Sequence, residues 1–148
     1  MWTLQFLGKF HGFVPLLLRA LVGASFAFSH GYGKLFPDGS FDGGKAFVTS
    51  PQASPLAPAF LLYIAAWTEF LAGLGVLAGL LTRWAAIGIL AVMTYAIFGV
   101  HWKNGFAAQN QGYEMALMYA TMSLCIMALG PGSLSLDRLF FQKAALNA

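Results

Sequence analysis

Four long apolar segments dominate this chain of 148 residues and limit what it can fold into. They cover about residues 13–36, 57–81, 82–102 and 112–130, close to the roughly 20 residues that a helix needs to cross a bilayer. Only 9% of the residues are charged, whereas a soluble domain averages about 25%. These polar side chains are too few to cover a surface in water. We therefore predict an all-α, polytopic membrane protein.

The connections between the apolar segments predict how the helices are arranged. The joins at 80–83 and 103–111 are short, which favours an up-down-up-down bundle of four transmembrane helices. The link at 37–56 is longer and rich in Gly, Pro and Ser, so we expect it at the interface as a loop or a re-entrant turn. The first segment runs on into SHGYGKLF without a small-residue cleavage site, which favours a helix over a cleaved signal peptide.

The distribution of charge favours an orientation with both termini inside, because cytoplasmic loops carry an excess of Lys and Arg. In that orientation the inner side holds Lys9, Arg83, Arg138 and Lys143. The outer side holds Lys45 and Lys103, accompanied by Asp38 and Asp42.

Composition also excludes several classes of function. The formal net charge of +3 comes from scattered residues without a basic cluster, so nucleic acid is not expected as a partner. The lone cysteine, Cys125, rules out an internal disulfide, a C-x-x-C redox pair and a multi-cysteine metal site. We expect no metal centre, and a redox function would need a bound cofactor or another subunit.

A single glutamate, Glu69, lies within the second segment, in the stretch AAWTEFLAGLGVLAGLLTR. An ionisable residue at this depth is costly, faces the bundle interior and needs a partner. By helix rise, Glu69 lies roughly 7–9 Å in depth from both Arg19 and His30. We predict an intramembrane ion pair between Arg19 and Glu69, with a hydrogen bond to His30 as the alternative. The pair either fixes helix register or takes part in function.

Polar residues in the other segments gather at one end of the predicted bundle. On a wheel of about 100° per residue, Arg19, His30 and Lys34 share one face of the first segment. In the chosen orientation, the outer third of the bundle holds a candidate polar site of His30, Lys34, His101 and Glu114. Lys34, His101 and Glu114, each taken alone, are better explained as interfacial side chains with solvated heads. Four such residues at one end favour a binding site.

Glycines in the second segment follow helical rather than loop spacing. Gly73, Gly75 and Gly79 lie within the apolar run, and no strand precedes them as a nucleotide-binding loop would require. We predict that they allow close helix packing.

Five sequence landmarks occur in order along the chain. HGYGKLF ends the first segment, EFLAGLGVLAGLLTR lies in the second, HWKNGF follows the third, and GYEMALMYA and GPGSLSLD open and close the fourth. Together they resemble the DoxX family of small bacterial membrane proteins over about residues 14–140. The resemblance implies one DoxX-type domain with four helices across the inner membrane. Its polar landmarks fall by position on His30, Lys34, Glu69, Arg83, His101, Glu114 and Asp137, of which Arg83 and Asp137 are expected to be structural residues at the inner rim.

Relatives in this family are linked to quinone-dependent sulfur oxidation, to oxidative stress and to complexes of redox enzymes. The resemblance therefore implies an accessory subunit of a quinone-linked system, with other membrane or redox subunits as partners and a quinone as the cofactor. A structural or assembly subunit and a proton-coupled small-molecule transporter are the alternatives. Haem held by His30 and His101 is not expected, because His30 is predicted roughly 9 Å inward of the end of its helix.

Overall fold

The computed structural model describes residues 12–50 and 57–142, and these residues form helices without any strand. The predicted all-α fold is confirmed. The main helices are α1 (Val14–Ala24), α4 (Ala59–Ala78), α5 (Thr82–Tyr95) and α6 (Glu114–Leu129). Two π-helical segments extend them, η2 (Ser25–Tyr32) after α1 and η4 (Ala96–His101) after α5. Shorter elements are α2 (Gly33–Leu35), η3 (Pro37–Gly39), α3 (Lys45–Thr49), η5 (Trp102–Asn104), η6 (Ala108–Asn110) and η7 (Arg138–Gln142).

Three helical stretches are long and apolar enough to cross a membrane: Val14–Leu35, Ala59–Ala78 and Thr82–Asn104. Helix α6 is also apolar but has only 16 residues, about 24 Å by helix rise. The chain is thus a multi-pass membrane protein, and a fourth crossing by α6 stays a prediction. Lys9, Lys143 and the end of the link at 51–56 lie outside the described residues.

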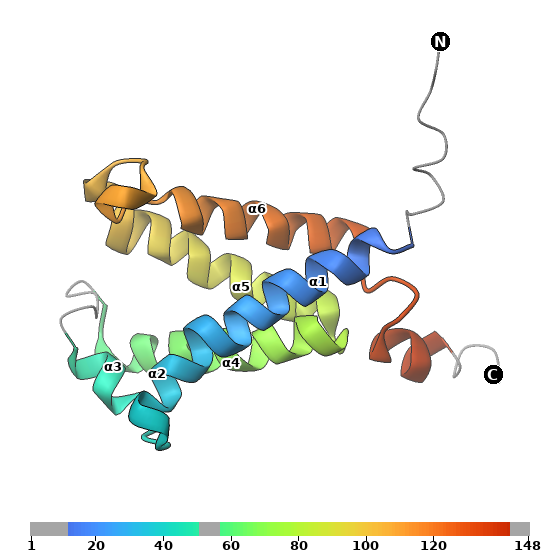
Figure 1. Ribbon diagram of the computed structural model, residues 1–148, viewed down its shortest axis with the longest axis horizontal. Coiled ribbons are helices and arrows are strands. Elements are labelled where there is room, and N and C mark those ends of the chain that lie inside the picture. The colour runs from blue at the N-terminus through green and yellow to red at the C-terminus, as the bar shows by residue number, and fades with distance from the viewer. Residues whose placement is uncertain (1–11, 51–56, 143–148) are drawn as a thin grey trace, which may run out of the picture.

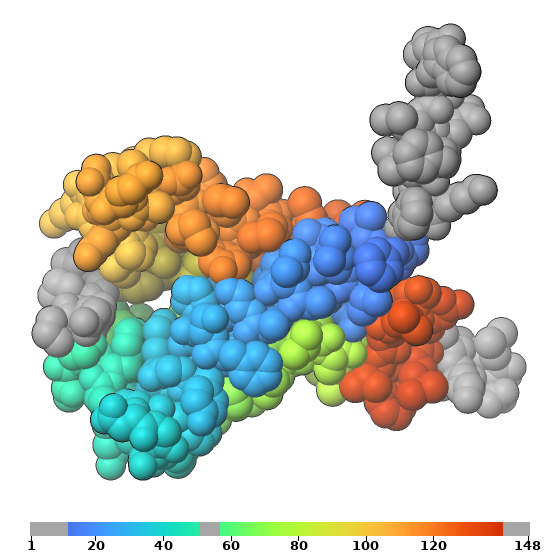
Figure 2. All heavy atoms as spheres, in the orientation of Figure 1, coloured from blue at the N-terminus to red at the C-terminus, as the bar shows by residue number. Residues whose placement is uncertain are grey.

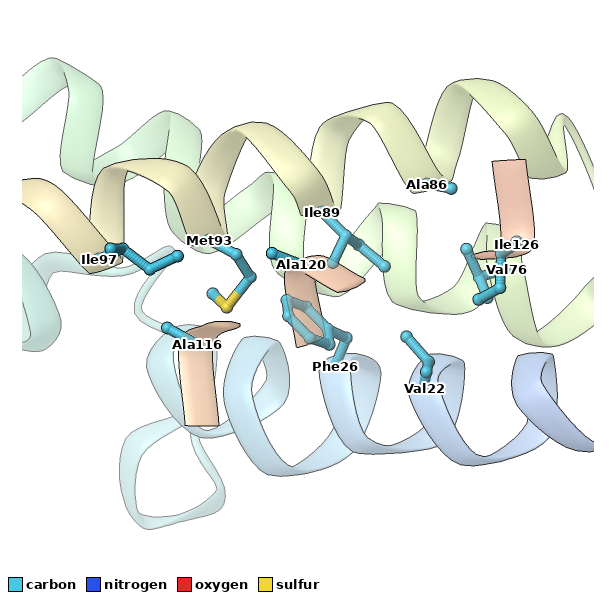
Figure 3. Packing of buried hydrophobic residues seen from close by; sticks show 10 residues of the cluster. All are labelled: Val22, Phe26, Val76, Ala86, Ile89, Met93, Ile97, Ala116, Ala120 and Ile126. Carbon is cyan, nitrogen blue, oxygen red and sulfur yellow. The ribbon is translucent and has the colours of Figure 1, made fainter. Parts of the chain in front are cut away.

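The four main helices pack side by side, and successive helices alternate in direction (Figure 1). Buried apolar side chains from all four helices and from both π-helical segments form one core (Figure 3). This core contains Val22, Phe26, Val76, Ala86, Ile89, Met93, Ile97, Ala116, Ala120 and Ile126. Many large apolar side chains on the outside are exposed, as is expected for helices that face lipid.

Helix α4 and the first helical stretch approach closely through glycine, as the sequence predicts for Gly73. A Cβ on Gly73 would overlap the backbone of Ala27, and a Cβ on Gly23 would lie 2.5 Å from the backbone nitrogen of Leu77. Small residues of this kind let membrane helices pack backbone to backbone. The close contact fixes η2 against the middle of α4.

The described part of the link, residues 37–50, folds back toward α4. Asp42 accepts hydrogen bonds of 2.8 Å from the backbone N–H groups of Gly44 and Ala46, which starts α3. The Phe41 ring packs edge-on against Trp67 of α4, with 5.9 Å between ring centroids. These contacts hold α3 over one end of the bundle, beside α2 (Figure 1).

Candidate functional site

A pocket of about 290 Å³ lies at the end of the bundle that contains η2 and η4. Apolar side chains make up most of its wall, and its polar lining residues are His30, Lys34, Glu69, Tyr95, His101 and Tyr119. Figure 2 shows the molecule hollowed at this end, between the blue segment of η2 and the gold segment that follows α5. We call this the polar pocket.

Both π-helical segments contribute to the wall of the polar pocket, η2 through His30 and η4 through Val100 and His101. A π-helix closes i→i+5 hydrogen bonds and is rare, and where it occurs in a longer helix it often marks a functional site. Two helices thus change their winding beside the same pocket. This change alters the direction in which the histidine side chains project from the two helices.

An ion pair joins Lys34 and Glu69 at the pocket wall, with Nζ 2.5 Å from Oε2. Glu69 is ten residues into α4, about 15 Å by helix rise, and its side chain is only 3% exposed. The Lys34 ammonium also lies 4.5 Å from the centre of the Phe47 ring in α3, within range of a cation–π interaction. Glu69 therefore pairs with Lys34 and not, as the sequence analysis predicts, with Arg19.

Arg19 instead donates hydrogen bonds to four backbone carbonyl groups. Their oxygens belong to Val76 and Leu77 at the end of α4 and to Pro131 and Leu134 after α6, at 2.5–3.1 Å. Val76 lies seven residues beyond Glu69, about 10 Å farther along α4. Carbonyl groups at a helix C-terminus carry partial negative charge and so stabilise a buried cation. Arg19 therefore links α1 to α4 and to the segment after α6.

His30 is held in the pocket wall by aromatic packing. Its ring lies 5.3 Å from the ring of Phe26 and 5.6 Å from that of Tyr119, and it is nearly perpendicular to Tyr119. The Tyr119 hydroxyl shares a 2.6 Å hydrogen bond with the Ser25 hydroxyl, which fixes the tyrosine. Within the described residues, neither ring nitrogen of His30 has a hydrogen-bond partner, so both are available to a ligand.

His101 reaches the same pocket from η4, and a hydrogen bond sets its orientation. Its Nδ1 lies 2.7 Å from the carbonyl oxygen of Gln111. Because a carbonyl oxygen only accepts, Nδ1 carries the proton, and Nε2 of the neutral ring is the acceptor. Gln111 has a positive φ of 58°, which turns its carbonyl group within the loop before α6.

Glu114 does not join the other predicted residues at the pocket. Its Oε2 accepts a 2.9 Å hydrogen bond from the backbone N–H of Ala108, within the loop that precedes α6. The loop folds back over the start of α6, as the hydrogen bond from the Glu114 N–H to the Phe106 carbonyl shows. The carboxylate therefore braces the loop that carries Gln111, the partner of His101.

The two residues expected at the inner rim make contacts near the ends of α4 and α5. Asp137 accepts hydrogen bonds from the backbone N–H groups of Leu81 and Thr82 and from the Thr82 hydroxyl, at 2.6–2.9 Å. These donors lie at the start of α5, so Asp137 caps this helix. Arg83 is exposed, and its guanidinium lies beside Gly130.

Comparison with known proteins places these residues in a family. The sequence profile of the DoxX family matches residues 14–102. The chain belongs to the DoxX family. An uncharacterized protein of Haemophilus influenzae is 32% identical over 142 residues, which cover 93% of this DoxX protein and 98% of the relative. A second uncharacterized protein of that organism is 33% identical over 61 residues, or 41% of this chain and 40% of the relative. No solved structure matches at a significant level.

The part of the chain that matches the DoxX profile contains most of the polar pocket. His30, Lys34, Glu69 and His101 all lie within residues 14–102, whereas Tyr119 lies beyond them on α6. The sequence analysis does not select Tyr119 or Phe47 for the site. The available signal for Tyr119 was a hydroxyl-bearing aromatic residue within an apolar helix, which usually needs a polar partner. No sequence pattern marks Phe47.

The polar pocket has the chemistry to hold a small amphiphilic group. Its wall is mostly apolar, and the ring nitrogens of His30 and Nε2 of His101 can each form a hydrogen bond with a ligand. The Lys34–Glu69 pair is a second polar feature of this wall. An uncharged ring with hydrogen-bond acceptors fits this lining better than a strongly charged ligand does, because the charges of the pair largely balance.

Proposed function

We propose that the polar pocket binds the head group of a quinone, and that the chain is an accessory component of a quinone-linked redox or oxidative-stress system. The observation that carries the proposal is the pair of histidines at one mostly apolar pocket, reached from two membrane-spanning helices. A quinone head group is an apolar ring with two carbonyl acceptors, and each acceptor needs a donor. His30 can donate to one carbonyl from a ring N–H, and His101 can donate to the other from Nε2 when its ring is an imidazolium, since Nδ1 already donates to Gln111.

Reduction of a quinone to a quinol takes up two electrons and two protons, one on each carbonyl oxygen. In this proposal the electrons come from a partner redox subunit in the membrane. Each histidine in its imidazolium form donates a proton to the quinone oxygen that it contacts, becomes neutral and is reprotonated from solvent. Glu69 lies at the same wall, and its carboxylate favours the imidazolium form of His30 that donates the proton.

The proposal also includes an orientation. With both termini inside a bacterial inner membrane and α6 as the fourth crossing, the polar pocket opens toward the periplasm. The charge distribution supports this arrangement, since Arg83 and Arg138 then lie inside and Lys45 and Lys103 outside, the latter offset by Asp38 and Asp42. In a Cys125→Ser background, labelling of Lys45→Cys and Arg138→Cys with a membrane-impermeant reagent, on intact cells and after the membrane is opened, tests the orientation.

The first test measures bound quinone. The protein is purified from its native host in mild detergent, and quinones and copurifying proteins are quantified by mass spectrometry. We expect near-stoichiometric quinone, and we expect its loss in His30→Ala. The matched control is Thr121→Val, because the Thr121 hydroxyl donates its hydrogen bond within α6, to the Leu117 carbonyl. Both variants must elute as folded protein.

Other outcomes assign the chain to another class. A stable complex with partner subunits and no quinone in the wild-type protein indicates a structural or assembly subunit. Substrate-dependent proton flux in liposomes that contain this chain alone indicates a transporter. Either result overturns the quinone proposal.

A further inference from the structure

A second hollow, of about 320 Å³, lies on the outer face between α4 and α5. We call it the α4–α5 groove. Its wall is almost entirely apolar, and exposed side chains such as Leu61 and Ile64 place it on the lipid-facing side. Four residues line both this groove and the polar pocket: Leu62, Ala65, Val92 and Tyr95.

The shared residues mean that one layer of side chains separates the interior of the bundle from the membrane. The layer is thin at Ala65, whose side chain is a single methyl group. The Tyr95 ring borders η4, because a Cβ on Gly99 would lie 2.8 Å from Cε2 of the ring. The ring therefore rests on a glycine at the point where α5 passes into its π-helical segment. The two volumes therefore border each other at this layer.

The groove continues along the outer face beyond this layer. A further hollow of about 440 Å³ shares Ile64, Thr68 and Gly88 with it and extends to Trp67 and Trp84. Along α4 the two hollows together run from Leu61 to Leu71, about 15 Å by helix rise. The two adjoining hollows form an apolar surface that begins at the wall of the polar pocket.

We propose that the α4–α5 groove holds the long apolar side chain of the quinone whose head group occupies the polar pocket, and that Leu62, Ala65, Val92 and Tyr95 form the side opening between them. This inference rests on the proposed function. The occupant of both volumes must pass an opening one side chain wide. An alkyl or prenyl chain is thin enough, whereas a helix from a partner protein is about 10 Å across.

The test compares two probes on the purified full-length protein in detergent. One probe is the ubiquinone head group without a long side chain, and the other is its decyl derivative. The variant is Ala91→Phe, because Ala91 is exposed on α5 and lines the groove but not the polar pocket. We expect the phenylalanine to fill the groove and weaken binding of the decyl probe about tenfold, the loss expected when two methylene groups are no longer buried. Binding of the head group alone stays unchanged.

Two further variants keep the result interpretable. Ala128→Phe adds the same side chain at an exposed position on α6, outside these hollows, and is expected to change neither affinity. Ile64→Trp fills the groove from α4 and replaces Ala91→Phe if that variant does not fold. Equal weakening of both probes, or none in either groove variant, overturns the side opening while the head-group site stands. A wild-type protein that binds neither probe overturns the proposed function, and this inference with it.

Discussion

Lys34, near the end of the first helical stretch, neutralises Glu69 in the middle of α4 across a distance of 2.5 Å. The two side chains are not equally buried: Lys34 is 24% exposed and Glu69 only 3%. Removing one partner therefore has different consequences at the two positions. A carboxylate without its lysine stays inside the bundle, whereas an ammonium without its glutamate still reaches the solvated end of the pocket.

We expect Lys34→Met to destabilise the protein by about 3 kcal/mol, because it leaves a buried charge without a partner. Glu69→Gln is expected to cost only about 1 kcal/mol, since the lysine head is partly solvated. The double variant Lys34→Met/Glu69→Gln recovers most of the loss of Lys34→Met. Thermal unfolding in mild detergent measures all three free energies.

The control for this comparison is Lys103→Met, at an exposed lysine without an ion pair in the described chain. Its stability is expected to stay within about 0.5 kcal/mol of the wild type. Additive effects in the double variant would show that the Lys34–Glu69 contact does not couple the two helices energetically.

Arg19 gives a second prediction, because its role depends on geometry as well as charge. Arg19→Lys keeps the charge, but an ammonium cannot reach carbonyl groups on both α4 and the segment after α6 from a single point. At least one buried carbonyl loses its donor, and we expect a loss of about 1–3 kcal/mol in unfolding free energy. Arg83→Lys, at an exposed arginine, is the matched control and is expected to be neutral. Equal stability of both variants would contradict the role of Arg19 as a link between these elements.

The partners of Arg19 could not be predicted from the sequence, although the helices could. The apolar runs predict the helices well, because helix length and hydropathy are properties of local sequence. A carbonyl oxygen is present at every residue, so no pattern of side chains reveals that the end of α4 and residues 131–134 solvate an arginine. An acidic side chain is the counter-charge that a sequence can show, and Glu69 is the nearest one in depth.

The helical wheel has a related limit. A wheel of about 100° per residue assumes an α-helix, but the first stretch becomes π-helical from Ser25 and the third from Ala96. Beyond these points the side chains, including those of His30 and His101, project from their helices in directions that the wheel does not predict. The prediction that Glu114 joins the polar site is wrong for another reason. The loop before α6 folds back over the start of this helix, and no spacing in the sequence predicts that fold.

Acid is expected to loosen α3 through Asp42. The backbone N–H groups of Ala46 and Gly44 stabilise the charged carboxylate and hold the pKa of Asp42 below its usual range. A carboxyl whose pKa is lower in the folded state stabilises the fold at pH values above its unfolded pKa. That contribution is lost as the pH falls through the lower, folded pKa.

The measurement is the amide hydrogen-exchange protection of Ala46, corrected for the intrinsic effect of pH. Protection is expected to fall on the acidic side of the ordinary aspartate range and to be low at every pH in Asp42→Ala. If the protection of the Ala46 amide does not change as Asp42 titrates, α3 is held by its aromatic contacts alone.

Gly73 provides a prediction in which helix propensity and packing oppose each other. Alanine favours a helix by about 1 kcal/mol over glycine, but a Cβ at Gly73 would lie 2.8 Å from Cα of Ala27 and closer still to its backbone nitrogen. Since backbone atoms in a packed helix cannot move aside individually, α4 and η2 must separate, and we expect Gly73→Ala to lose about 1–3 kcal/mol. Gly33→Ala is the matched control, because a Cβ there meets no atom within 4 Å and the helical φ of −62° suits alanine. It is expected to be neutral or slightly stabilising. Thermal unfolding of the two variants in the same detergent separates packing from propensity, and equal gains in both would show that α4 and η2 do not depend on this close approach.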